Sequence, residues 1–208
     1  MSTVARFDGD LRVTGSLQVD GNLPTITRAD ISQNANSRLS VPMTAFRVWD
    51  AMGSVLPSSS SADDIGIAGG TFGTNSPKLT TGDVKTTTVT RYGRVMIPLP
   101  ENYEDGETVT LRLHAGMETT VSDGTATVDV EAYKSDSEAG IGSDLCSTAA
   151  QSINSLTFAD KDFTITPTGL SAGDMLDVRV TLAVSDTATG TAVTATIGAV
   201  ELLADTKG

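Results

Sequence analysis

His114 is the only histidine of the chain, so it is the first candidate for acid–base or nucleophilic chemistry. A Ser–His–Asp triad needs this imidazole within reach of a serine on a nucleophile turn, and we predict no such turn. His114 lies between Leu113 and Ala115 on an expected strand, on the face opposite the apolar residues. We therefore expect an exposed or intersubunit histidine and no catalytic residue.

Neighbouring carboxylates are the second group that could do chemistry, and they occur at Asp63/Asp64, Glu104/Asp105 and Asp160/Asp162. A glycosidase needs two carboxyl groups about 5 to 10 Å apart across a cleft, whereas adjacent acids in loops are usually solvated. Calcium accepts oxygen ligands of this type, with candidates at Asp174 and at Asp136/Glu138. The sequence lacks the Asp-x-Asp-x-Asp-Gly spacing, and we predict no metal and no cofactor.

Aromatic side chains offer a third kind of chemistry, the stacking of sugar rings. Trp49, Tyr103 and Tyr133 could form such a platform, although Trp49 could equally anchor a subunit interface. The glycine-rich stretch 66–73 lacks the Gly-Lys-Ser/Thr ending of a phosphate-binding loop, and it is expected to form a tight turn or an edge strand.

The net charge and the cysteine content limit the kinds of binding partner and the folding compartment that we expect for this chain. The net charge is −12 with a pI near 4.3, which disfavours nucleic acid and anionic membrane surfaces. Cys146 is the single cysteine, so no disulfide can form within the chain and a reducing cytoplasm is the expected folding compartment. We predict neither a signal peptide nor a membrane span.

Residues 7–23 form a strictly alternating stripe, which is the element expected to make contacts through the N-terminal part of the chain. Odd positions are apolar or glycine, even positions are polar, and the stripe repeats as Gly-x-Leu-x-Val-x. Alternation of this kind predicts a half-buried strand. Because so short a strand cannot cover its own apolar face, the stripe predicts burial against other chains. With the interface candidate Trp49, the assembly-face candidates are Phe7, Leu11, Val13, Leu17, Val19, Leu23 and Trp49.

Period-two alternation continues through the rest of the chain with turn signals between the segments. Strands are expected at 45–56, 65–72, 86–99, 108–117, 126–133, 156–166, 175–184 and 192–203. Residues 145–153 fit either a strand or one helical turn. We predict an all-β, antiparallel, jelly-roll-like sandwich over 45–208, preceded by an extended β-repeat arm over 1–44.

The Gly-x-Leu-x-Val-x arm resembles the N-terminal repeats of tailed-phage fibre and virion appendage proteins. It also resembles the bactofilin repeat, but fewer than three full repeats are present, too few for a single-chain β-helix. The remainder resembles β-rich phage virion proteins in Phe46-Arg-Val-Trp-Asp, in Gly69-Gly-Thr-Phe-Gly-Thr, in Thr110-Leu-Arg-Leu-His-Ala-Gly-Met and in Ile197-Gly-Ala-Val-Glu-Leu-Leu. The resemblance implies a viral structural protein.

Two functional hypotheses follow, and a third carries less weight. The first is a non-enzymatic capsid decoration or cement protein, a homotrimer that bridges subunits of the major capsid protein on the virion surface. The alternative is a head-fibre, tail-fibre or receptor-binding protein that recognises host glycans. The third is a glycan-active enzyme, which is disfavoured because the neighbouring acids are expected to be solvated and no catalytic motif is present.

Overall fold

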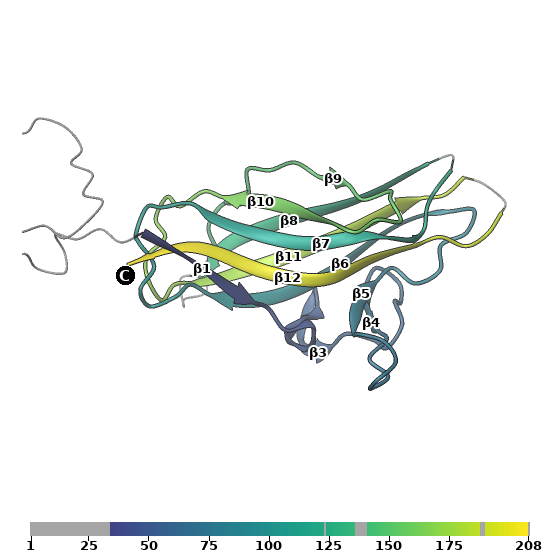
Figure 1. Cartoon of the computed structure of the whole chain (residues 1–208), viewed down its shortest axis with the longest axis horizontal. Helices are drawn as coiled ribbons and strands as arrows, with labels where there is room; N and C mark the ends of the chain where they lie inside the picture. Colours follow the sequence, from purple (N-terminus) through teal and green to yellow (C-terminus); the bar gives the residue numbers. More distant parts are fainter. Residues whose placement is uncertain (1–33, 123, 136–140, 188–189, 208) are drawn as a thin grey trace, which may run out of the picture. The chain divides into compact units, whose positions relative to one another are not determined.

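The long strands fold into two antiparallel sheets packed face to face (Figure 1). The computed structural model describes residues 34–122, 124–135, 141–187 and 190–207. The first sheet contains β5 (Lys78–Thr80), β12 (Thr194–Lys207), β7 (Val109–Thr119) and β10 (Ala159–Ile165), with β4 (Gly66–Ala68) beside β5. The second contains β6 (Thr88–Pro98), β11 (Met175–Ser185), β8 (Thr125–Ser135) and β9 (Gln151–Ser152), with β2 (Arg47–Val48) and β3 (Ala51–Val55) on the β6 side.

Strand pairing identifies the sandwich as a jelly roll. Within the run β5 to β12, the first strand pairs with the last, the second with the one before it, and so on: β5 with β12, β6 with β11, β7 with β10 and β8 with β9. This nested pairing is that of a long hairpin rolled into two four-stranded sheets. The predicted all-β, antiparallel, jelly-roll-like fold is confirmed.

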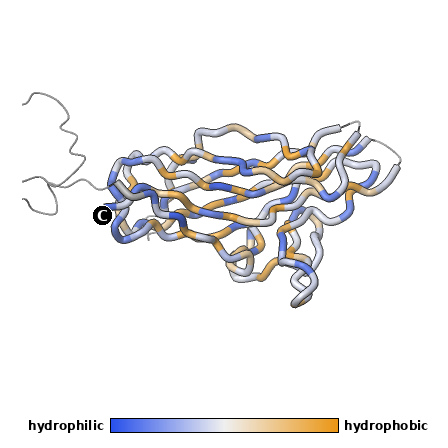
Figure 2. Tube along the Cα trace, viewed as in Figure 1, coloured by the Kyte–Doolittle hydropathy of each residue, from blue (hydrophilic) through white to orange (hydrophobic). Residues whose placement is uncertain are grey.

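The core lies between the sheets and is built by the predicted alternation (Figure 2). Val109, Leu111, Leu113 and Ala115 of β7 are buried, as are Leu176, Val178, Val180, Leu182 and Val184 of β11. Because side chains alternate across a strand, the residues between these point outward. The same alternation therefore also determines which residues lie on the outer face of each sheet.

The predicted strand over 45–56 is divided in the structure. Met43–Ala45 form a short 3-10 turn, and β2 and β3 form a hairpin around a turn at Trp49 and Asp50. Phe46 is buried against Gly93 of β6, where a β-carbon on the glycine would lie 3.4 Å from the Phe46 ring. This packing fixes the start of the β2–β3 hairpin against β6.

Three short elements were not predicted in their observed form. β5 carries only three residues, too few for a visible alternation. Residues 145–153 contain no helical turn, so the helical interpretation is wrong. Only Gln151–Ser152 form a strand, β9, and Cys146 makes an isolated bridge to Ile165 of β10. The predicted strand 65–72 is shorter, ending with β4 at Ala68.

The N-terminal boundary also differs from the prediction. β1 (Asn34–Ser40) pairs antiparallel with the last seven residues of β12, from Ser40 opposite Glu201 to Asn34 opposite Lys207. The compact unit that contains the sandwich begins at Gln33 and not at residue 45. The segment 34–44 therefore belongs to the sandwich, because backbone pairing with β12 holds it there. Residues 1–33 lie outside the described residues.

Candidate functional site

The outer face of the second sheet gathers aromatic and charged side chains from three strands. Arg179 of β11 lies between Arg94 of β6 and Glu131 of β8 in the strand register, and Asp177 lies opposite Tyr133. Tyr92 lies one row further along β6, opposite Thr181. We call this group the aromatic–arginine face: Trp49, Tyr92, Arg94, Glu131, Tyr133, Asp177 and Arg179.

The side of β6 that pairs with β2 brings Trp49 onto this face. β2 pairs with β6 through Arg47 and Arg94, and the turn that follows carries Trp49. Further along the same edge, the Tyr92 N–H donates to the Asp63 carbonyl at 2.7 Å. The Trp49 indole N–H then donates to the Asp63 carboxylate at 3.0 Å. Two separate segments thus hold the indole over β6.

Trp49, Tyr92 and Arg179 form one stacked cluster. The centroids of the two rings are 5.1 Å apart, and their planes are tilted by 51°. The Arg179 guanidinium carbon lies 4.8 Å from the Tyr92 centroid and 5.5 Å from the Trp49 centroid. Cation–π attraction therefore orders a cation and two half-buried rings on the surface of the sheet.

Two ion pairs complete the aromatic–arginine face. Arg94 clasps Asp177 with two hydrogen bonds, the Nε–Oδ1 distance being 2.7 Å. The hydrogen bond to Asp177 raises the pKa of Arg94 despite burial. Arg179 pairs with Glu131 at 2.5 Å. In the described part of the chain, the buried Arg179 Nε–H has no hydrogen-bond partner.

This arrangement presents the groups that a sugar needs. A pyranose has apolar C–H faces, which pack on aromatic rings, and a rim of hydroxyls, which bond to guanidinium and carboxylate groups. The unpaired Arg179 Nε–H is itself buried, as are the unpaired Asp64 Oδ1, Arg91 Nε–H and Arg91 Nη1–H of the described residues, so the rings and the remaining guanidinium and carboxylate atoms are the groups that face a ligand.

The predicted platform of Trp49, Tyr103 and Tyr133 is only partly assembled. Trp49 and Tyr133 share the aromatic–arginine face, and burial raises the pKa of Tyr133. Tyr103 does not take part: its exposure is 0%, and its hydroxyl donates to the Glu107 carbonyl. Placing Tyr103 in a surface platform is therefore wrong, because the turn before β7 folds its ring into the core.

Sequence reasoning missed Tyr92 and Arg179, although a signal for both was available. Val95 and Ile97 are buried, so alternation along β6 sends Tyr92 outward. Val178 and Val180 are buried, so alternation along β11 does the same for Arg179. What alternation does not reveal is which outward residues of different strands become neighbours.

His114 and the Asp160/Asp162 pair lie on the opposite face of the sandwich. His114 Nδ1 is 2.8 Å from Asp160, and its ring lies 5.9 Å from Phe158. Arg112 clasps Asp162 with two hydrogen bonds of 2.7 Å, which lower the pKa of that carboxyl. The predicted exposed position of His114 is confirmed, and both carboxylates serve as partners of basic side chains.

Residues 169–173 read Gly-Leu-Ser-Ala-Gly, so the Gly-x-Ser-x-Gly spacing of a nucleophile elbow is present although no nucleophile turn was predicted. The structure places them in the loop between β10 and β11. A nucleophile elbow joins a strand to a helix, whereas this loop leads into a strand. His114 lies opposite Asp160 in the strand register, at the end of β10 that is far from this loop. The geometry therefore does not build a triad around Ser171.

The remaining acidic candidates are mostly engaged within the chain. The Asp174 carboxylate accepts from the Ser171 N–H at 2.7 Å and pairs with Lys134 at 2.7 Å. Burial and the neighbouring Asp63 and Asp50 raise the pKa of Asp64. The described residues contain no cluster of three or more potential metal ligands among His, Cys, Asp and Glu. Asp136 and Glu138 lie outside the described residues.

The other sequence candidates have simpler outcomes. Gly66–Ala68 form the short strand β4 at the edge of the first sheet. No helix in the described ranges is long and apolar enough to span a membrane. The assembly-face candidates of the N-terminal stripe lie outside the described residues and stay predictions: Phe7, Leu11, Val13, Leu17, Val19 and Leu23.

Comparisons with known proteins returned distant likenesses of fold. No family model and no curated protein matches the chain. Among solved structures, a xylan-binding module CBM15 is 14% identical, with 84% of this chain and 100% of that chain covered and a TM-score of 0.42. The CBM22-1 xylan-binding domain of Paenibacillus barcinonensis Xyn10C is 10% identical, with 70% and 82% covered and a TM-score of 0.38. At these scores the likeness carries no functional weight, and the aromatic–arginine face stands on its own geometry.

Proposed function

We propose that this protein is a non-enzymatic recognition module that binds glycans on the aromatic–arginine face. The observation that carries the proposal is the Trp49–Tyr92–Arg179 cluster, in which two tilted rings and a cation converge on the surface of the sheet. Sugar C–H groups pack against the rings, and the hydroxyls bond to Arg179, Glu131 and Asp177. Because each arginine of the face is already balanced by a carboxylate, the proposed ligand is a neutral glycan.

The proposal is tested with a panel of neutral oligosaccharides and the full-length protein. Trp49 is the only tryptophan, so its fluorescence reports directly on occupancy of the face. We expect Trp49→Ala and Tyr92→Ala each to weaken binding about thirtyfold or more, the cost of losing a central aromatic contact; calorimetry measures this where the tryptophan is removed. Phe158→Ala, on the opposite face, is the matched control. Equal losses in Trp49→Ala and Phe158→Ala, or no binding by the wild type across the panel, would contradict the proposal.

A second candidate function, capsid decoration, rests on the alternating stripe over residues 7–23. In this proposal the protein is a homotrimer on the virion surface that binds the major capsid protein through the stripe and bridges capsomers. Burial of the stripe against other chains supplies the stabilisation.

The attachment is tested with Leu17→Asp, which introduces a charge into the apolar side of the stripe. We expect this variant to lose binding to capsid particles and the associated rise in capsid disruption temperature. Its glycan binding and circular dichroism are expected to be those of the wild type. If this variant still bound capsid particles, the proposed attachment through the stripe would be wrong, and the proposed glycan site would be unaffected.

A further inference from the structure

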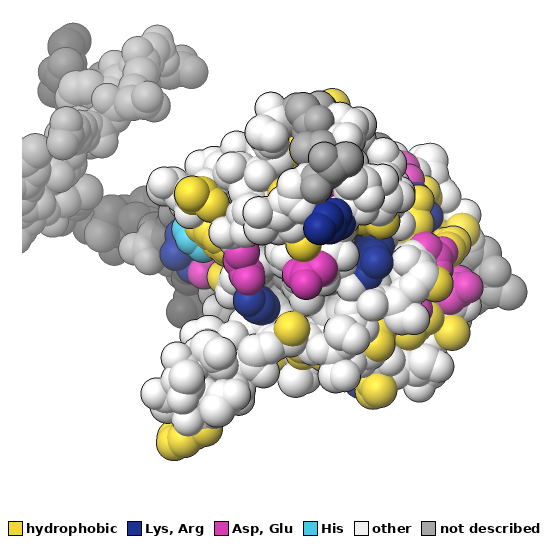
Figure 3. Space-filling view, turned by 90° about the vertical axis from the view of Figure 1, so that its right-hand side faces the viewer, with side chains coloured by type: hydrophobic (Ala, Val, Ile, Leu, Met, Phe, Trp, Pro, Cys, Tyr) yellow, Lys and Arg dark blue, Asp and Glu magenta, His cyan; other side chains and the backbone are white. Residues whose placement is uncertain are grey.

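The loop between β4 and β5 holds an aromatic side chain entirely in solvent. Phe72 is 102% exposed, and Figure 3 shows a hydrophobic side chain at the tip of a lobe that projects from the body. Gly69, Gly70 and Gly73 adopt positive φ angles in this loop. A phenylalanine at such a position exposes apolar area that burial would remove from water.

Hydrogen bonds fix this loop rather than leaving Phe72 on a loose tip. The Thr74 and Asn75 N–H groups donate to the Thr71 carbonyl at 2.9 and 3.1 Å. The Thr71 N–H donates in return to the Asn75 side-chain oxygen at 3.0 Å. Phe72 is therefore presented in a defined geometry, which lowers the entropic cost of binding through it.

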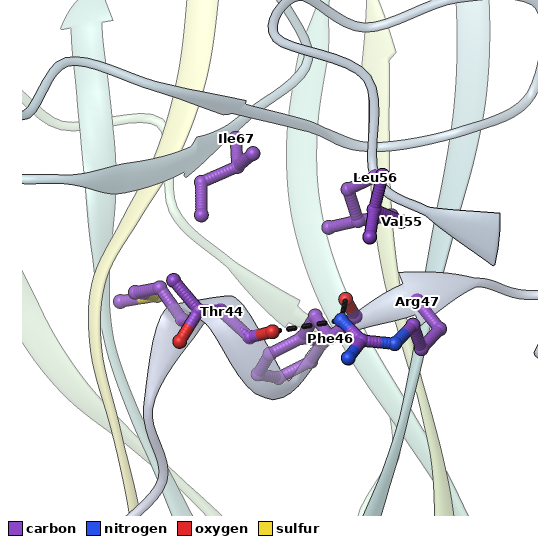
Figure 4. Close-up of a pocket in the computed structure, with 7 residues that line it drawn as sticks. Thr44, Phe46, Arg47, Val55, Leu56 and Ile67 are labelled. Carbon is purple, nitrogen blue, oxygen red and sulfur yellow. Dashed lines mark hydrogen bonds between the residues drawn. The ribbon is translucent and has the colours of Figure 1, made fainter. Parts of the chain in front are cut away.

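A small apolar pocket lies between the segment 43–56 and Ile67 of β4, the strand that leads into this loop (Figure 4). Its volume is about 130 Å³, and its lining residues are Met43, Thr44, Phe46, Arg47, Val55, Leu56 and Ile67. Val55 is 71% exposed, so the pocket has an apolar wall that faces solvent. The Arg47 guanidinium donates to the Thr44 and Phe46 carbonyls at 2.8 and 3.1 Å, which occupies the one charged group in the lining.

The size and polarity of the pocket select its occupant. An apolar cavity of about 150 Å³ accommodates one benzene ring, so this pocket suits one aromatic side chain. Among the described residues, Phe72 is the most exposed large hydrophobic side chain, since the others range from 37% to 71%. We propose that Phe72 of one copy inserts into the pocket of a second copy of this chain.

The position of the two features allows both symmetries of such a contact. Ile67 of the pocket and Phe72 are separated by five positions of the same β4–β5 segment. Two copies related by a two-fold axis exchange their Phe72 side chains reciprocally, and a head-to-tail arrangement closes a ring such as the predicted trimer. Each copy carries a net charge of −12, so the contact strengthens as salt screens the repulsion between copies.

A photo-crosslinking phenylalanine analogue at position 72 of the full chain tests the contact directly. Isotopically heavy and light copies are mixed at physiological salt, and the crosslinked peptides are identified by mass spectrometry. The expected product joins the position-72 peptide of one copy to a peptide containing residues 43–47 or 55–67 of the other. Crosslinks confined to a single chain, crosslinks to another surface, or a monomer at every concentration would overturn the proposal.

Complementary variants keep the test independent of folding. Phe72→Ser keeps the pocket, Val55→Glu keeps the aromatic side chain, and each should weaken self-association by about tenfold to a hundredfold per contact. Mixing the two variants should restore one Phe72–pocket contact and produce mixed oligomers in sedimentation velocity.

Leu156→Glu, at another exposed apolar position, is the matched control and should associate as the wild type. If the mixture of the two variants self-associates no more strongly than either variant alone, Phe72 does not insert into the pocket of a second copy. Glycan binding by Phe72→Ser should be unchanged, which separates this result from the proposed function.

Discussion

On the outer face of the second sheet Arg94 clasps Asp177, and on the outer face of the first sheet Arg112 clasps Asp162. The chemistry of the two pairs is the same, but their surroundings differ. The Asp177 side chain is 9% exposed, whereas that of Asp162 is 47% exposed. Solvent screens the second pair far more than the first. The pair on the aromatic–arginine face is therefore part of the packed structure, and the other is a surface ion pair.

The aromatic residues of the two faces differ in the same sense. Phe158 lies over Gly116 and Gly198 on the first sheet, where the missing side chains let its ring pack against the backbone. Trp49 and Tyr92 stack with Arg179, whose Nε–H is left without a partner in the part of the chain that is described. The ring on the first face packs down onto its own sheet, whereas the two rings on the second face stack with a cation.

The largest expected contrast between the faces comes from removing one acid from each. Asp177→Ala should lower the free energy of unfolding by about 1 to 3 kcal/mol, because it leaves Arg94 two-thirds buried without its partner. Asp162→Ala should cost less than about 1 kcal/mol, as exposed pairs do. Urea denaturation measures both. Equal losses would show that the two faces are not screened differently.

A replacement of the whole pair sharpens that contrast. Arg94→Met combined with Asp177→Leu should recover most of the stability lost in Asp177→Ala, because no buried charge is left unpaired. The double variant should still lose glycan affinity, since Asp177 and Arg94 are part of the proposed binding face.

A smaller effect is expected at the glycines beneath Phe158. A β-carbon at Gly116 would lie 2.5 Å from the Phe158 ring, whereas one at Gly198 would lie 3.8 Å from it. Gly116→Ala should therefore destabilise the protein by about 1 kcal/mol, while Gly198→Ala should be neutral or slightly stabilising. Thermal unfolding measures the difference. Adding Phe158→Ala should remove the penalty at Gly116; if it persists, the ring is not its cause.

The smallest effect is the acid dependence of the Arg112–Asp162 pair. Arg112 lowers the pKa of Asp162 below its ordinary 3.8 in the folded protein. A depressed folded-state pKa gives stabilisation that is fully present well above pH 3.8 and is lost as pH falls through the depressed pKa. Asp162→Asn should therefore destabilise the protein slightly at pH 7, by a few tenths of a kcal/mol. The difference should vanish at strongly acidic pH, and a difference that grew with acid would contradict the assignment.

Alternation along the long strands made the jelly roll predictable, and with it the buried faces of β7 and β11. It also fixed which residues face outward, including His114. It could not reveal β5, whose three residues are held by pairing with β12 and not by a pattern of their own. Nor could it show that Tyr103 folds inward, because a turn residue obeys no strand period.

What the sequence by itself determined is the strand period, the absence of an internal disulfide and the apolar stripe over residues 7–23. Only the tertiary structure decided that Trp49, Tyr92 and Arg179 meet, although 130 positions separate the first from the last. Alternation assigns a residue to a face, but strand order and register assign its neighbours across the sheet. The same reason applies to Phe72 and the pocket, because exposure and cavity shape depend on how distant segments pack.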